Sequence, residues 1–212
     1  MLVKDGHEIK WSHLISAYRW DVRNNTVRSY EKLTDGHFSM DTAAKLRNHL
    51  AEEVLNENML KLVLEYVERV PDNGDSFKGV VDFLTQTSKV VGIFKDVKPI
   101  QSIDDERMDT LKQFHKWLLS WENSAENSRQ LLSKECRQDW SCTILAFCSL
   151  VENVLETHPD AELVPATFNT NLLKNVFGCQ RGLVAGTGEN PTVLQYCENI
   201  NTITLANNTL AT

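Results

Sequence analysis

Hydrophobic positions recur at helical spacing along most of the chain, which predicts a mainly α-helical protein with little strand. The spacing of Trp11, Leu14 and Tyr18 predicts a short amphipathic helix over about residues 9–20. A longer helix is predicted from Asp41 to Val70, because its apolar residues form one stripe that stops at the turn-rich sequence PDNGDS.

Three further segments continue the pattern. Residues 77–94 are apolar at intervals that fit a helix or, in part, a strand. Asp104 and Asp105 favour the start of another helix through the helix macrodipole. One face of that helix would carry Met108, Leu111, Phe114, Leu118 and Trp121. Residues 137–156 are nearly apolar throughout, so we expect a buried helix there, with Cys142 and Cys148 acting as small hydrophobic residues.

The C-terminal part is predicted to contain two more helices, at about residues 170–179 and 191–203, after an irregular connection between Pro159 and Pro165. Between them lies a turn with Gly182, Gly186 and Gly188. Glycines before a helix can cradle a phosphate, but this turn lacks the GKS or GKT sequence and follows no clear strand. We therefore expect a plain connection.

Composition narrows the possible classes of function. The chain has 212 residues, 42% of them hydrophobic, which is enough to bury a core. A net charge of -7 argues against a surface devoted to nucleic-acid phosphates, although a local basic face remains possible. The five cysteines form no CxxC pair, which fits reduced thiols rather than a zinc site. Neither a signal peptide nor an apolar run long enough to span a membrane is recognised, so we expect a soluble intracellular protein.

Few side chains suggest chemistry by themselves. His37, His49 and His115 have no nucleophile or second histidine at a spacing that suggests a proton relay, so we expect them to be solvated or packed. The acidic run from Asp104 to Asp109 fits a helix start better than a metal site. These residues alone predict a helical domain without an assignable activity.

Three separated stretches carry the most specific motifs. The first comprises HEIKWSHLISAYRWD and YEKLTDGHFSMDTAAKLRNHLAEEVLNENM, the second is RQDWSCTILAFCSLVENVL, and the third joins FNTNLLKNVFGCQRG to GENPTVLQY. The first stretch resembles the Trp-led and Lys-Leu-Thr segments of the P-element and THAP-domain transposase family. The second resembles the family's apolar helix that follows an Arg-Lys-Thr-Gly-Phe motif. The third resembles its Asp-His-Leu-Glu-x-x-Phe-Gly and Asn-Pro-Thr-x-x-Gln-Phe segments. Of the Arg-Lys-Thr-Gly-Phe motif, only Arg137 clearly remains.

The resemblance implies an RNase H-like catalytic fold interrupted by a helical insertion domain that binds GTP. On this mapping, residues 1–162 are similar to the insertion domain and residues 163–212 to the returning C-terminal part of the RNase H-like domain. The first two catalytic aspartates of the family lie upstream of its Trp-led segment and have no counterpart in this chain. The start at Met1 fits a truncated gene model or an excised fragment.

The third family carboxylate, a glutamate, corresponds to Lys174, and a neighbouring aspartate corresponds to Asn171. Family enzymes hold Mg²⁺ with their carboxylates, whereas a protonated Lys offers no lone pair and repels the cation. The resemblance therefore implies a catalytically inactive chain with no catalytic or metal-binding residue of its own. Lys174 could also be an ordinary exposed helix residue.

The family's guanine-binding sequence, Phe-Asp-x-x-Asn, corresponds without gaps to Val91, Gly92 and Lys95. These residues lack the aromatic face and the carboxylate that guanine needs, which implies a degraded GTP site, although Phe94 and Asp96 lie close by.

We therefore expect an inactive transposase fragment derived from a transposable element. The alternatives are a retained GTP-binding module or a protein-interaction module within a larger nucleoprotein complex. By resemblance, its partners would include terminal-repeat DNA through the parent protein and other copies of the chain, and its location would be nuclear.

Overall fold

Helices dominate the chain, as the sequence predicts. The computed structural model describes residues 2–39, 48–70 and 74–168, together with Thr192, Leu194, Gln195 and Asn199. Its α-helices are α1 (Trp11–Asn24), α3 (Asn48–Val54), α4 (Glu57–Arg69), α5 (Gly74–Ile93), α6 (Glu106–Ser124) and α7 (Lys134–Thr157). Within this described part, no helix is both long enough and apolar enough to cross a membrane.

The chain divides into two compact units, Met1–Ala166 and Thr167–Thr212. All of these helices belong to the first unit. The predicted helices at 170–179 and 191–203, the glycine-rich turn, Asn171 and Lys174 lie outside the described residues, apart from the four isolated positions in 192–199. The assignment of residues 1–162 and 163–212 to two transposase domains stays a prediction.

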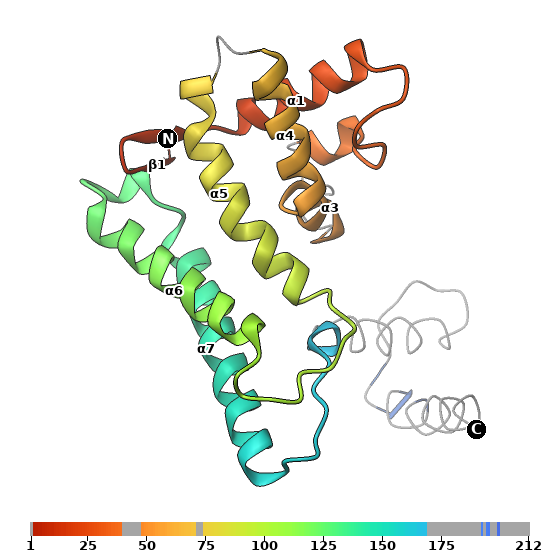
Figure 1. The fold of residues 1–212 in the computed structure, drawn as a ribbon, viewed down its shortest axis with the longest axis vertical. Coiled ribbons are helices and arrows are strands. Elements are labelled where there is room, and N and C mark those ends of the chain that lie inside the picture. Colours follow the sequence, from red (N-terminus) through yellow and green to blue (C-terminus); the bar gives the residue numbers. More distant parts are fainter. Residues whose placement is uncertain are drawn as a thin grey trace. The chain divides into compact units, whose positions relative to one another are not determined.

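Helix α5 lies between α4 and α6 (Figure 1) and is shared by two hydrophobic cores. Its first half packs Phe77, Val80 and Leu84 against α1, α3 and α4. Its last turns place Val90 and Ile93 in a second core with α6 and α7. The segment 77–94, which the sequence left open between helix and strand, is helical as far as Ile93. Its apolar residues recur three and four positions apart, so one helix serves both cores.

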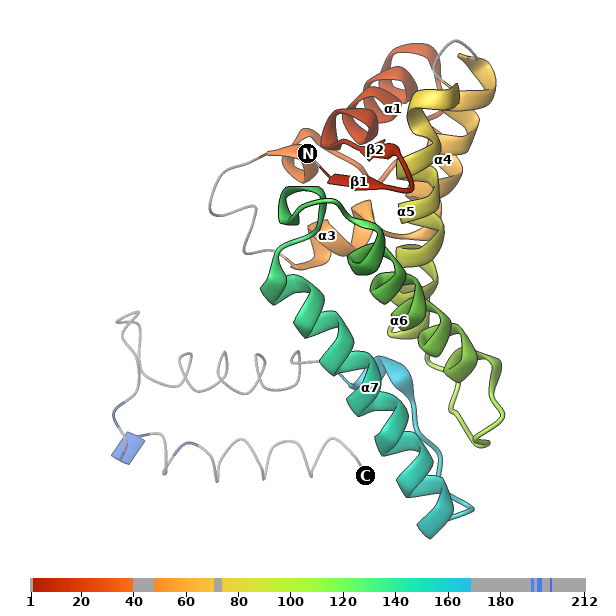
Figure 2. The same cartoon turned by 90° about the vertical axis from the view of Figure 1, so that its left-hand side faces the viewer.

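A short β-hairpin precedes α1 and lies against α5 (Figure 2). Strand β1 (Leu2–Lys4) pairs antiparallel with β2 (His7–Ile9). Asp5 and Gly6 both have positive φ, of 49° and 78°, as a two-residue hairpin turn requires. The Trp121 indole N–H donates to the Val3 carbonyl oxygen at 2.6 Å, so the hairpin is also fastened to α6.

The predicted helix from Asp41 to Val70 is wrong as one element. Within the described residues it comprises α3 and α4, separated at Leu55 and Asn56. Asn56 adopts an extended backbone, and its side chain accepts a hydrogen bond from Met59 N at 3.1 Å. This N-cap begins a new helix, because it satisfies a backbone N–H that has no partner in a first turn.

The helix predicted over 137–156 exists, but the expectation that it is buried throughout is wrong. Ile144, Phe147 and Val151 of α7 are buried in the second core. Leu145 and Leu150 are 49% and 40% exposed. Cys148 is buried as expected, whereas Cys142 is exposed. Helix α7 packs against the rest of the unit along one face only, so the apolar residues outside that face stay exposed.

Helix α6 behaves as the sequence predicts. Each of the residues expected on its inner face is buried, namely Met108, Leu111, Phe114, Leu118 and Trp121. Asp105 caps its N-terminus by accepting a hydrogen bond from Arg107 N at 2.9 Å. The acidic run 104–109 thus marks a helix start, as its sequence indicates.

Gly79 permits the closest approach between the hairpin and α5. A Cβ atom at this position would lie 2.5 Å from the Glu8 carbonyl oxygen and 3.1 Å from the His7 carbonyl carbon. Both are backbone atoms, which cannot move away as the end of a flexible side chain can. Glycine is therefore required in the middle of α5, where it would otherwise weaken a helix.

Replacing Gly79 by Ala should lower the free energy of unfolding by about 1–3 kcal/mol, because the hairpin must move away from α5. Thermal and urea unfolding would measure the change. Gly92→Ala in the same helix is the matched control, since nothing lies within 4 Å of its Cβ position. That control should be neutral or stabilising by up to about 1 kcal/mol. Equal stability of the Gly79→Ala and wild-type proteins would contradict the close contact.

Candidate functional site

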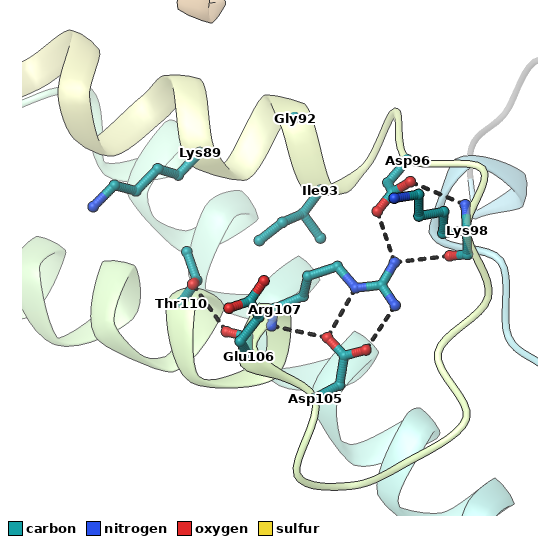
Figure 3. Close-up of a pocket in the computed structure, with 9 residues that line it drawn as sticks. All are labelled: Lys89, Gly92, Ile93, Asp96, Lys98, Asp105, Glu106, Arg107 and Thr110. Atoms are coloured by element: carbon teal, nitrogen blue, oxygen red, sulfur yellow. Dashed lines mark hydrogen bonds and ion pairs between the residues drawn. The ribbon is translucent and has the colours of Figure 1, made fainter.

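A recess of about 630 Å³ lies where α5 ends and α6 begins (Figure 3). The last turns of α5 contribute Lys89, Gly92 and Ile93, and the loop contributes Asp96 and Lys98. The start of α6 contributes Asp105, Glu106, Arg107 and Thr110. The recess is thus built where the chain reverses direction between two helices of the second core.

Arg107 dominates this recess. Its side chain is only 15% exposed, and its Nε and Nη2 atoms bind the two carboxylate oxygens of Asp105 at 2.8 and 2.7 Å. Nη1 donates to Asp96 Oδ2 at 2.8 Å. Nη1 and Nη2 also donate to the carbonyl oxygens of Lys98 and Pro99, at 2.7 and 2.9 Å. A guanidinium has five N–H donors, so this set of acceptors can use all of them.

This arrangement favours the ionised form of Asp105. Hydrogen bonds from the Arg107 side chain lower the pKa of the Asp105 carboxyl below its ordinary value, with a further contribution from the Arg107 backbone N–H. The side-chain hydrogen bond to Asp105, and more weakly the contact with Asp96, raises the pKa of the Arg107 guanidinium. The carboxylate also lies at the N-terminus of α6, where the helix macrodipole favours negative charge.

Asp96 is the second carboxylate of the recess. A hydrogen bond from Lys98 N, at 2.9 Å, is the main cause that lowers the pKa of Asp96, and Arg107 adds to it. The Asp96 carbonyl oxygen accepts from Ala166 N at 3.1 Å, and Ile100 pairs with Leu163 through both backbone hydrogen bonds. The α5–α6 loop is thereby tied to the segment that follows α7.

The recess is lined by three basic residues, Lys89, Lys98 and Arg107, and by three acidic ones, Asp96, Asp105 and Glu106, so its formal charges balance. In the close-up, the Lys89 side chain points away from Arg107 (Figure 3). Among the described residues that line the recess there is no His, Cys or Ser. Across residues 2–39, 48–70 and 74–168, no group of three or more His, Cys, Asp or Glu side chains could hold a metal ion.

The three guanine-site positions inferred from the family resemblance have different surroundings in the structure. Gly92 lines the recess, whereas Val91 is half-buried and does not line it. Lys95 is exposed and pairs with Glu52 of α3 at 2.9 Å. Their assignment to a degraded guanine site stays a prediction.

Most of the specific affinity for guanine would come from an aromatic face that stacks on the base and a carboxylate that accepts from its N–H edge. Among the described side chains that line the recess, none is aromatic. The neighbouring Phe94 packs instead against Phe147 in the second core, with ring centroids 5.2 Å apart. Asp96 and Asp105 are both engaged by Arg107. The third carboxylate, Glu106, lies exposed on the first turn of α6. Because no aromatic side chain accompanies it, the described residues of the recess do not fit a guanine nucleotide.

The histidines considered from the sequence do not meet. His37 is buried and forms a capping box with Thr34, while its Nε2 lies 2.5 Å from Glu53 Oε2. His49 is exposed and His115 is half-buried on α6. Sequence reasoning missed Arg107, whose only local signal is its position two residues after the N-cap Asp105.

Comparison with known proteins gives one structural likeness. No family model matches the sequence, and no curated protein does either. Among solved structures, the chain is similar to one in the "Drosophila P element transposase strand transfer complex", with a TM-score of 0.75 and 15% sequence identity. The match covers 98% of this chain and 48% of that chain, so this chain spans about half the length of its structural neighbour. At this identity the likeness shows a shared fold.

Replacing Asp105 by Asn should lower the free energy of unfolding at pH 7 by about 1–2 kcal/mol, because a charge-assisted hydrogen bond is lost while the N-cap is kept. The folded-state pKa of Asp105 is depressed, so its contribution is complete above the unfolded pKa of about 3.9 and is lost as pH falls through the lower folded value.

The stability difference between wild type and Asp105→Asn should therefore shrink below about pH 4. Urea unfolding at several pH values would measure it. Asp104→Asn is the matched control, because Asp104 is the exposed neighbouring residue and its removal should leave stability unchanged at pH 7. A difference that stays constant down to pH 2 would contradict the role of the Asp105 charge.

Proposed function

We propose that this chain is derived from a P-element-type transposase and has no strand-transfer activity of its own. The observation that carries the proposal is the structural match over 98% of the chain at a TM-score of 0.75. The order of the three family-like stretches supports it independently, because they were recognised from residue types rather than from the fold. On this proposal the chain works as an interaction module of a larger nuclear nucleoprotein complex.

The expected lack of catalysis follows from the chemistry of phosphoryl transfer. Two-metal enzymes of this kind stabilise both the attacking and the leaving oxygen with paired cations. Carboxylates must hold these cations, and Lys174 stands where the family has its glutamate. Exchange of Glu for Lys removes a ligand and places a positive charge beside the cation at the same time.

A role in protein contact is supported by the outer face of α7. Leu145 and Leu150 are exposed there, and the sequence from Ser141 to Val151 contains no charged residue. Apolar side chains on an otherwise uncharged helix face are typical of surfaces that are covered in an assembly.

A DNA-cleavage assay tests the proposal directly. The purified chain is incubated with Mg²⁺ or Mn²⁺ and DNA carrying nicked or blunt terminal-repeat ends, and an intact P element transposase serves as the positive control. We expect neither cleavage nor joining by this chain. Cleavage by the chain alone would overturn the proposed inactivity.

The variant Lys174→Glu should also remain inactive, because Asn171 still offers only a neutral oxygen where the family resemblance puts a neighbouring aspartate. The same assay at matched protein and metal concentrations measures this outcome. Mg²⁺-dependent cleavage restored by that single change would show that the remaining ligands are present after all.

A further inference from the structure

The guanidinium of Arg107 and the guanine base present the same kind of edge to a carboxylate. Each is planar and offers neighbouring N–H donors that can bind both oxygens at once. Arg107 makes this two-pronged contact with Asp105 at 2.8 and 2.7 Å. It does so in the recess that Gly92 lines, where the resemblance puts the aspartate of the guanine-binding sequence.

We propose that Arg107 is an internal substitute for a guanine ligand, so that the domain completes the α5–α6 recess from within its own chain and folds without nucleotide. Arg107 then occupies both Asp96 and Asp105, and the remaining carboxylate of the recess, Glu106, has no aromatic residue beside it among the described lining residues on which a base could stack. The inference concerns nucleotide independence alone, so its failure would leave the proposed transposase origin and lack of cleavage untouched.

The contacts of Arg107 join segments that would otherwise be separate. Asp96 follows α5, the carbonyls of Lys98 and Pro99 lie in the loop, and Asp105 caps α6. A bound ligand in such a recess commonly stabilises a fold by linking the same kinds of group. Here the linking group is covalently part of α6, so no ligand concentration is needed.

The packing around the α5–α6 loop depends on the same contacts of Arg107. Asp96 also accepts from Ala166 through its backbone carbonyl, and Ile100 pairs with Leu163. Ile100 is fully buried in the second core. Loss of Arg107 would release the loop that positions Ile100, so the effect should reach the packing of α6 and α7.

The geometry also predicts that lysine cannot replace Arg107. An ammonium keeps the charge but has three donors on one atom, and it cannot bind both oxygens of Asp105 while reaching Asp96 and two carbonyl groups. A purely electrostatic role would tolerate Lys, whereas a fork-shaped contact would not. Arg107→Lys therefore separates the two explanations.

The experiment compares the full chain with its Arg107→Ala and Arg107→Lys variants by thermal unfolding. Both variants should unfold about 5 °C or more below wild type, because carboxylates and carbonyl groups lose their donors. Arg19→Ala is the matched control, since Arg19 is exposed on α1 and should leave the midpoint unchanged. An Arg107→Ala midpoint equal to that of wild type would overturn the proposal.

Chemical rescue tests whether the position behaves like a ligand site. Millimolar methylguanidinium should raise the unfolding midpoint of Arg107→Ala toward that of wild type, while the same concentration of methylammonium should not. Neither compound should affect wild type. A folded Arg107→Ala protein without selective rescue would show that Arg107 is only a structural tie, which would overturn its role as a ligand substitute.

Calorimetry on the wild-type chain provides a test that needs no variant to fold. GTP and ATP, each with Mg²⁺, are titrated into the protein at neutral pH. We expect no binding of either nucleotide. Micromolar binding with a preference for GTP over ATP would overturn the proposal, because the recess or another site would then still recognise guanine.

Discussion

Helix α5 contributes side chains to two hydrophobic cores, and this shared burial constrains the rest of the first unit. Its first half completes the core of α1, α3 and α4, and its last turns complete the core of α6 and α7. Neither group of helices could bury its apolar stripe to the same extent without this common rod. A third neighbour, the N-terminal hairpin, approaches α5 so closely that Gly79 has no room for a methyl group.

This arrangement explains why the candidate recess has its position. The second core must extend beyond Ile93, the last residue of α5, and Ile100 fills that place. The intervening loop carries polar backbone groups, which must find hydrogen-bond partners where water is partly excluded. Arg107 supplies donors to the carbonyls of Lys98 and Pro99, and the backbone pairing of Ile100 with Leu163 completes the loop.

Periodicity predicted most of the fold but not its interruptions. The inner face of α6 was predicted correctly because each apolar residue recurs at three or four positions. The division between α3 and α4 was missed, since the apolar stripe continues past Asn56 and only the capping geometry shows that the helix restarts. The hairpin was missed because strands of three residues give almost no alternation, and Asp5–Gly6 was its single turn signal.

The recess was harder to predict than the fold, because its contacts join residues far apart in the sequence and backbone groups. Asp96 lies eleven residues before Arg107, and two of the other acceptors are backbone carbonyls that have no side-chain signature. Packing energy is spread over many apolar residues, which tolerate exchange when size and pattern are kept. A ligand site depends on a few atoms. A fold can therefore persist at 15% identity without the few atoms of a particular recess being kept, and the fold alone does not reveal what a recess binds.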